Sequence, residues 1–233
     1  GHRIWTSPES YPETYYPDNE KVVYTTRVGG AEFTPQRQDE TGLQLSLLVE
    51  MDENEPKLKI THTITNTKKT PVTGAAWSLS VLDAGGIAIV PLSKKETGLL
   101  PSRNIVLWDY TDMTDDRLLF GKDTVAVRHD ASKQGALKIG IGQATGKIVY
   151  VNHGQALIKE YEADENASYP DFGSSTEIYT CPSFTEAETL SPLMTIGKNE
   201  RIVHTEIWTL KDNVSAPAFT AEALADFSEK SFE

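Results

Sequence analysis

Residues 58–65 have the sequence LKITHTIT, in which apolar and polar side chains alternate. Side chains two residues apart in a β-strand point to the same face of the sheet. The stretch therefore predicts a half-buried strand whose apolar face carries Ile60, His62 and Ile64. A histidine in the middle of that face needs an explanation, either as a packed core residue or as a functional group.

Strand-length stretches of the same kind fill most of the chain, with turn signals rich in Gly, Asn and Asp between them. Only the C-terminus looks helical, where Thr220 could cap a helix over residues 221–227. Thirteen short strands without intervening helices predict an all-β protein with an antiparallel sandwich, not a βαβ sheet. The expected strands are residues 21–28, 43–51, 57–66, 73–82, 86–91, 105–108, 124–128, 136–142, 147–153, 156–162, 176–180, 184–190 and 201–210.

The segment over residues 6–20 has a different composition. It contains three prolines and three tyrosines, and prolines are excluded from central strands because they cannot donate to the ladder. We interpret it as an ordered aromatic loop of functional interest, since long loops in compact domains often carry function.

Charge and composition exclude several classes of protein. The 233 residues carry 34 acidic and 22 basic side chains, a formal net charge of −12, which argues against nucleic acid or an anionic membrane as the main partner. No apolar run approaches the roughly 20 residues of a membrane span, and no signal peptide is visible at the start. The single cysteine, Cys181, excludes an intramolecular disulfide and a Cys-rich zinc site.

The polar residues on apolar strand faces are the candidates for function, and each has a structural alternative. His62 is either a hydrogen-bonded core histidine or a group placed for proton transfer. In residues 184–190, Glu186 and Glu188 share a face with Phe184 and Leu190. Two such carboxylates are costly unless they are paired or near solvent, so they indicate either a structural role or ligand binding.

The last expected strand places His204, Glu206 and Trp208 on one face. Carboxylates and imidazoles bind hydroxyl groups, and an indole ring covers the apolar C–H surface of a sugar. This row is therefore typical of a sugar site, although a core tryptophan beside a buried ion pair would give the same pattern.

No motif for a metal or a cofactor is found. The chain has no G-x-S-x-G elbow, no P-loop and no H-E-x-x-H. The five histidines lack metal-ligand spacing, so a zinc site would need ligands from distant strands. We expect no cofactor and no metal.

Several motifs resemble a bacterial family of uncharacterised domains that is grouped with the galactose mutarotase-like sandwiches. They include GHRIW at residues 1–5, YYPDN at 15–19, ITHTITNT at 60–67, EAETLSPL at 186–193 and HTEIW at 204–208. The resemblance implies an antiparallel supersandwich over residues 1–215 with a concave sugar-binding face, then a C-terminal helix and tail over 216–233. Family members carry one or two strands before the first motif, and the resemblance implies that this chain lacks them.

The resemblance also implies a chemistry. Mutarotases, or aldose 1-epimerases, open and reclose a hexose ring with a histidine acid and a glutamate base. Glu188 is the closest match to the glutamate, whereas the region matching the histidine motif is AWSL at residues 76–79 and holds no histidine. The resemblance implies Glu188 as the catalytic base, and His62, or alternatively His2, could supply the acid from another strand; of the two we expect His62.

The expected ligand is a small sugar or an oligosaccharide. Arg3, Lys159 and Trp77 would orient its hydroxyl groups or a carboxylate, which favours an acidic sugar. The alternatives are a glycan-binding domain without catalysis and a purely structural sandwich. The remaining candidates for contacts with the sugar are His2, Trp5, Glu177, His204 and Glu206.

Overall fold

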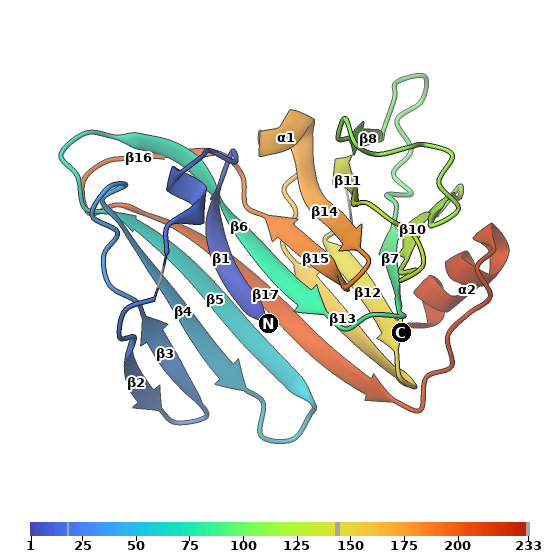
Figure 1. The fold of residues 1–233 in the computed structure, drawn as a ribbon, viewed down its shortest axis with the longest axis horizontal. Helices are drawn as coiled ribbons and strands as arrows, with labels where there is room; N and C mark the ends of the chain where they lie inside the picture. Colours follow the sequence, from blue (N-terminus) through green and yellow to red (C-terminus); the bar gives the residue numbers. More distant parts are fainter. Residues whose placement is uncertain (18, 143–144, 232–233) are drawn as a thin grey trace.

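Two antiparallel sheets form the protein (Figure 1), as a computed structural model of residues 1–17, 19–142 and 145–231 shows. The predicted all-β antiparallel sandwich is confirmed. Across the described residues, the smaller sheet has the order β1 (His2–Ser7), β6 (Val72–Leu82), β15 (Phe184–Leu190), β14 (Ser174–Cys181), β11 (Leu137–Gly142) and β8 (Asn104–Leu107), with β16 (Met194–Ile196) also on β6.

The larger sheet runs behind the smaller one along the whole molecule (Figure 1). Its order is β2 (Val23–Arg27), β3 (Gly30–Thr34), β4 (Leu43–Met51), β5 (Lys57–Asn66), β17 (Arg201–Asp212), β13 (Gln155–Tyr161), β12 (Lys147–Asn152), β7 (Ile87–Pro91), β10 (Thr124–Arg128) and β9 (Leu118–Phe120). Short helical segments are η1 (Glu13–Tyr15) and α1 (Pro170–Gly173).

The main core lies between the sheets and follows the predicted alternation. In the smaller sheet, Ile139, Ile178 and Ala187 point inward and pack with buried residues of the larger sheet such as Val90 and Ile148. Their neighbours in sequence must therefore point to the opposite side. We call this side, which is directed away from the larger sheet, the outer face.

The first strand was not predicted. Residues 2–7 form β1, which pairs antiparallel with β6 so that Trp5 lies opposite Trp77. Among the described residues β1 is one edge of the smaller sheet. The stretch is short and polar, so its alternation of His2 and Ile4 against Arg3 and Trp5 gives too weak a signal on its own.

The C-terminal helix α2 (Ala221–Ser231) is longer than predicted. The Thr220 hydroxyl accepts a hydrogen bond from the Ala223 amide at 3.3 Å, as expected of an N-cap. Leu224 is fully buried in a second core cluster on the far side of the larger sheet, with Ile89 and Ile158. None of the described helices combines the length and the hydropathy needed to cross a bilayer.

Candidate functional site

The candidate residues divide between the two faces of the smaller sheet. In β15, Thr189 points inward and contacts His204, so the adjacent Glu188 points outward. The outer face carries Arg3, Trp5, Trp77, Glu177 and Glu188, whereas the space between the sheets holds His2, His62, Lys159, His204 and Glu206.

A lysine between two glutamates is the centre of the outer face. The Lys138 Nζ atom lies 2.7 Å from Glu177 Oε2 and 2.9 Å from Glu188 Oε2. The exposed fractions of the three side chains are 6%, 0% and 1%. They come from β11, β14 and β15, neighbouring strands whose outward positions alternate with the apolar core positions. We call these three residues the outer triad.

Indole rings surround the outer triad. The Lys138 Nζ atom is 4.4 Å from the ring centroid of Trp77 and 4.7 Å from that of Trp108, within range of cation–π attraction. Trp77 also donates its Nε1 hydrogen to Glu188 Oε2 at 2.6 Å. Trp5 meets Trp77 edge to face at 5.5 Å, and Tyr15 packs against Trp5 at 4.9 Å.

The outer triad has more carboxyl groups than cations and has acceptors without a partner. Within the described residues, the buried Oε1 atoms of Glu177 and Glu188 have no hydrogen-bond partner. Burial raises the pKa of Glu177 well above its usual value; the nearby Lys138 opposes this shift and Glu188 adds to it. Burial disfavours the charged form of Lys138, but the two carboxylates outweigh it and raise the pKa of its ammonium group.

Glu186 lies beside the outer triad and is partly exposed. Burial, followed by repulsion from Glu188, raises the pKa of Glu186 to about 7, while Lys138 and Arg3 act in the opposite direction. Glu186 is therefore close to half-protonated at neutral pH. This is the state expected of a carboxyl group that can exchange a proton near physiological pH.

The inner group is an ion pair in a satisfied polar network. Glu206 accepts hydrogen bonds from Ser78 and Thr189 through Oε1 and from Trp208 through Oε2, at 2.9, 2.5 and 2.6 Å. Lys159 Nζ is 3.1 Å from Glu206 Oε1. Burial opposes ionisation, but the charge of Lys159 holds the pKa of Glu206 well below its usual value.

The hydrogen bonds fix the tautomers of the inner histidines. Lys159 donates to Ser80 Oγ at 2.8 Å, so the Ser80 hydroxyl can donate to His2 Nδ1 at 3.0 Å. His2 then carries its proton on Nε2, which is 2.7 Å from His62 Nε2. His62 Nδ1 must donate to the His204 carbonyl at 2.9 Å. Each ring nitrogen of His2 and His62 thus has a partner, as a structural histidine requires.

Three inner residues could in principle hold a metal ion. One ligand atom each of His2, His62 and Glu206 lies within 4.8 Å of the others. They come from distant strands, as a zinc site in this chain would require. The two imidazole nitrogens already share a proton at 2.7 Å and both Glu206 oxygens accept hydrogen bonds. The network is therefore complete without an ion.

The structure does not bring together Glu188 and His62, the acid–base pair expected from the sequence. His62 projects from β5 into the space between the sheets, whereas Glu188 lies on the outer face of the smaller sheet. The smaller sheet separates the two side chains, so one sugar ring cannot contact both. Lys159 is also on the inner side, where its ammonium group is used by Ser80, Ala187 and Glu206. These assignments are corrected here: His62 and Lys159 belong to the interior network.

Lys138 and Trp108 complete the outer face and were not predicted from the sequence. Lys138 is the one charged residue in the stretch LKIGIG at 137–142. Its position between the inward-pointing Leu137 and Ile139 was the available signal. Trp108 was expected to end a strand over residues 105–108, but β8 ends at Leu107 and Trp108 lies just beyond it.

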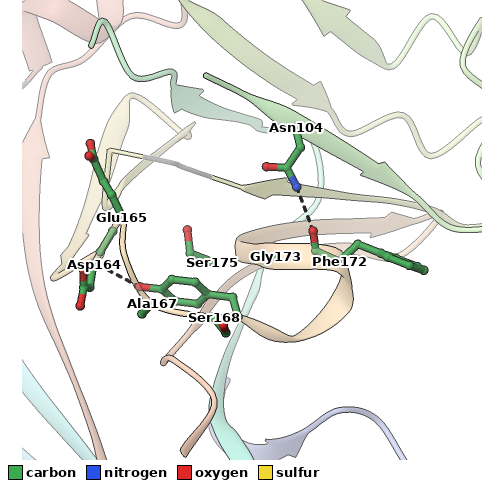
Figure 2. A pocket seen from close by; sticks show the side chains of 10 residues that line it. Asn104, Asp164, Glu165, Ala167, Ser168, Phe172, Gly173 and Ser175 are labelled. Carbon is green, nitrogen blue, oxygen red and sulfur yellow. Dashed lines mark hydrogen bonds between the residues drawn. The ribbon is translucent and has the colours of Figure 1, made fainter. Parts of the chain in front are cut away.

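A separate hollow of about 270 Å³ lies beside α1 and is lined by none of the outer triad (Figure 2). Asn104 donates to the Phe172 carbonyl at 3.0 Å, and the Phe172 ring is exposed and directed away from Ser175. Asp171 and Phe172 have positive φ angles of 48° and 56°. None of the residues predicted as functional lines this hollow.

No protein-family model and no curated protein sequence match the chain. Its fold is similar to that of a galactose mutarotase-like protein from Lactobacillus casei, with 10% identity over 82% of this chain and 72% of that chain, and a TM-score of 0.50. A putative aldose 1-epimerase from Klebsiella pneumoniae has 9% identity over 90% and 56%, with a TM-score of 0.50.

A TPR-domain containing protein from Parabacteroides distasonis is also similar, with 14% identity, 94% of this chain covered and a TM-score of 0.58. The chain spans 40% of that protein's length. At these identities the similarities show the fold alone. The resemblance to galactose mutarotase-like proteins is confirmed at that level.

Proposed function

We propose that this protein binds a carbohydrate on the outer face of the smaller sheet. The proposal rests on one observation: two buried carboxylates share the single ammonium group of Lys138 between the indole rings of Trp77 and Trp108. The galactose mutarotase-like fold supports a carbohydrate-related function.

The chemistry of the outer face suits a sugar. The free Oε1 atoms of Glu177 and Glu188 can accept hydrogen bonds from hydroxyl groups. The indole rings offer apolar surface for the C–H groups of a pyranose. Tyr15 and Tyr110, both about half exposed, contribute further aromatic surface near these groups.

Titration with sugars tests this proposal. We expect D-galactose or D-glucose to quench the tryptophan fluorescence of the protein saturably, because three of its four tryptophans lie on the outer face. Glu188→Gln keeps the shape of the side chain but removes its charge, so it should weaken binding at least about tenfold, as loss of a charged hydrogen bond predicts. The matched control, Glu229→Gln, changes an exposed carboxylate on α2 and should leave binding unchanged.

We propose aldose 1-epimerase-like catalysis as a second function, with Glu177 in place of His62. Glu188 would take the proton of the anomeric hydroxyl while a protonated Glu177 donates to the ring oxygen, which opens the ring. Rotation of the aldehyde and the reverse transfers would reclose it as the other anomer. The raised pKa of Glu177 favours this assignment, because it keeps one carboxyl group of the pair protonated.

Polarimetry on freshly dissolved α-D-galactose and α-D-glucose tests the second function. We expect Glu177→Gln and Glu188→Gln each to reduce the acceleration about 100-fold, the usual contribution of one acid or base. Acceleration that survives both substitutions would rule out this chemistry. Saturable binding without any acceleration would leave a binding domain.

A further inference from the structure

Carboxylates outnumber cations on the outer face. Glu177 and Glu188 lie directly opposite each other in the pairing of β14 with β15, and Glu186 is opposite Tyr179 in the same ladder. Like charges directly opposite destabilise a sheet. The raised pKa values of Glu177 and Glu186 relieve this repulsion, but three carboxyl groups around one buried lysine remain costly for the fold, which points to a role in binding.

Lys138 does not contact all of the carboxyl oxygens around it. Lys138 contacts one oxygen each of Glu177 and Glu188, and the other oxygen of each is buried without a hydrogen-bond partner in the described part of the chain. Glu186 makes no hydrogen bond or salt bridge to the described residues, and Arg3, the other nearby cation, is largely exposed. Glu186 is the partly exposed carboxyl group of the three, so a second cation can reach the site through it.

The surroundings of the site suit an ammonium group in particular. The ammonium group of Lys138 already lies against the faces of Trp77 and Trp108, at 4.4 and 4.7 Å from the ring centroids. Aromatic faces attract cations, most strongly where water is excluded. A ligand carboxylate would instead meet Glu177, Glu186 and Glu188.

We infer that the ligand is an amino sugar, whose ammonium group binds the carboxylates of Glu186 and Glu188. This inference rests on the proposed function, because it names the class of sugar that the outer face takes. It replaces the acidic sugar expected from the sequence. That expectation relied on Lys159, which lies between the sheets and is paired with Glu206.

Calorimetric titration at pH 6.5 with matched sugars tests the inference. The set is D-glucosamine, D-glucose, N-acetyl-D-glucosamine and D-glucuronic acid, which share one ring and differ in charge. We expect glucosamine to bind at least about tenfold more tightly than glucose or the N-acetyl derivative, since removal of a paired charge has effects of this size. Glucuronic acid should bind most weakly.

Binding of an ammonium group should also release protons, because it favours the charged forms of Glu186 and Glu177. The heat of glucosamine binding should therefore differ between two buffers of different ionisation enthalpy, whereas that of glucose should not. Glu186→Gln should reduce the preference for glucosamine over glucose, and Glu229→Gln should retain it.

The outcomes separate the two proposals. Equal binding of glucosamine and glucose, or tighter binding of glucuronic acid, would overturn the amino-sugar inference and leave the carbohydrate site standing. If none of these sugars binds to the folded protein, the proposed function fails and the inference fails with it.

Discussion

Lys138 is the residue on which the outer face depends. It is buried between two carboxylates and is the only cation that contacts them among the described residues. Removing one partner of a buried ionic cluster leaves uncompensated charge, which costs about 3–5 kcal/mol. We therefore expect Lys138→Met to lower the free energy of unfolding by about 3 kcal/mol in urea denaturation.

A second substitution should compensate in part for the loss of Lys138. Adding Glu188→Gln to Lys138→Met removes one of the stranded charges and should recover part of the lost stability. Lys94→Met, which disrupts an exposed pair with Glu229, should leave the urea midpoint unchanged. A Lys138→Met variant as stable as the parent protein would contradict a charged role for the outer triad.

The interior histidines predict a loss of stability in acid. Burial lowers the pKa of His204 to about 4, while an unfolded histidine titrates at about 6.5. Between these values the unfolded chain binds the proton and the folded protein does not. The free energy of unfolding is therefore unaffected by His204 above pH 6.5 and falls as the pH drops toward about 4, by about 3 kcal/mol in total.

Thermal unfolding at pH 7, 6, 5 and 4 measures this effect. His204→Gln retains a donor for Thr189 but cannot be protonated, so its melting temperature should fall less steeply with acid than that of the parent protein. If the melting temperatures of the two proteins fall in parallel with pH, protonation of His204 does not cause the loss of stability in acid.

At the residue scale, alternation along strands predicted correctly that His62 and Glu188 are buried among apolar neighbours. It could not predict that they lie on opposite sides of one sheet. Alternation sorts the residues of a strand into two faces. Only the packing of β6, β15 and β17 decides which of these faces points toward the other sheet. Lys138 was missed because a lone lysine in a strand is usually a solvated side chain.

At the scale of elements, the contribution of α2 can be tested directly. Leu224 is fully buried against Ile89 and Ile158 on the larger sheet. Leu224→Ala should lower the free energy of unfolding by about 2–5 kcal/mol, the range for a buried leucine. The exposed change Glu222→Ala on the same helix should leave the urea midpoint unchanged. An equally stable Leu224→Ala variant would mean that α2 does not stabilise the sandwich in solution.

Longer strands with clear alternation were predicted within a few residues, and four short elements were not. β4, β5 and β15 have the expected bounds, because their sequences alternate clearly and most of their residues are at least partly buried. β1, β3, β9 and β16 have three to six residues and expose part of their surface. β1 and β16 pair with β6, which is distant in the sequence, so a local pattern cannot reveal them. β3 and β9 pair with neighbouring strands but are too short for a clear alternation.

At the scale of the whole molecule, the two faces of the smaller sheet separate two roles. The interior polar network satisfies its own hydrogen bonds, as a structural network must. Among the described residues, the outer face keeps buried carboxyl oxygens without a hydrogen-bond partner and has more carboxyl groups than buried cations. We propose that a sugar binds on this outer face and not between the sheets.

The four tryptophans allow a direct test of where the sugar binds, because each contributes one indole N–H signal to a ¹H–¹⁵N NMR spectrum. Trp77 donates to Glu188 on the outer face, and Trp208 donates to Glu206 between the sheets. On titration with glucosamine we expect the signals of Trp77 and Trp108 to shift saturably while that of Trp208 stays in place. A shift of the Trp208 signal alone, with those of Trp77 and Trp108 unchanged, would show that the sugar does not bind on the outer face.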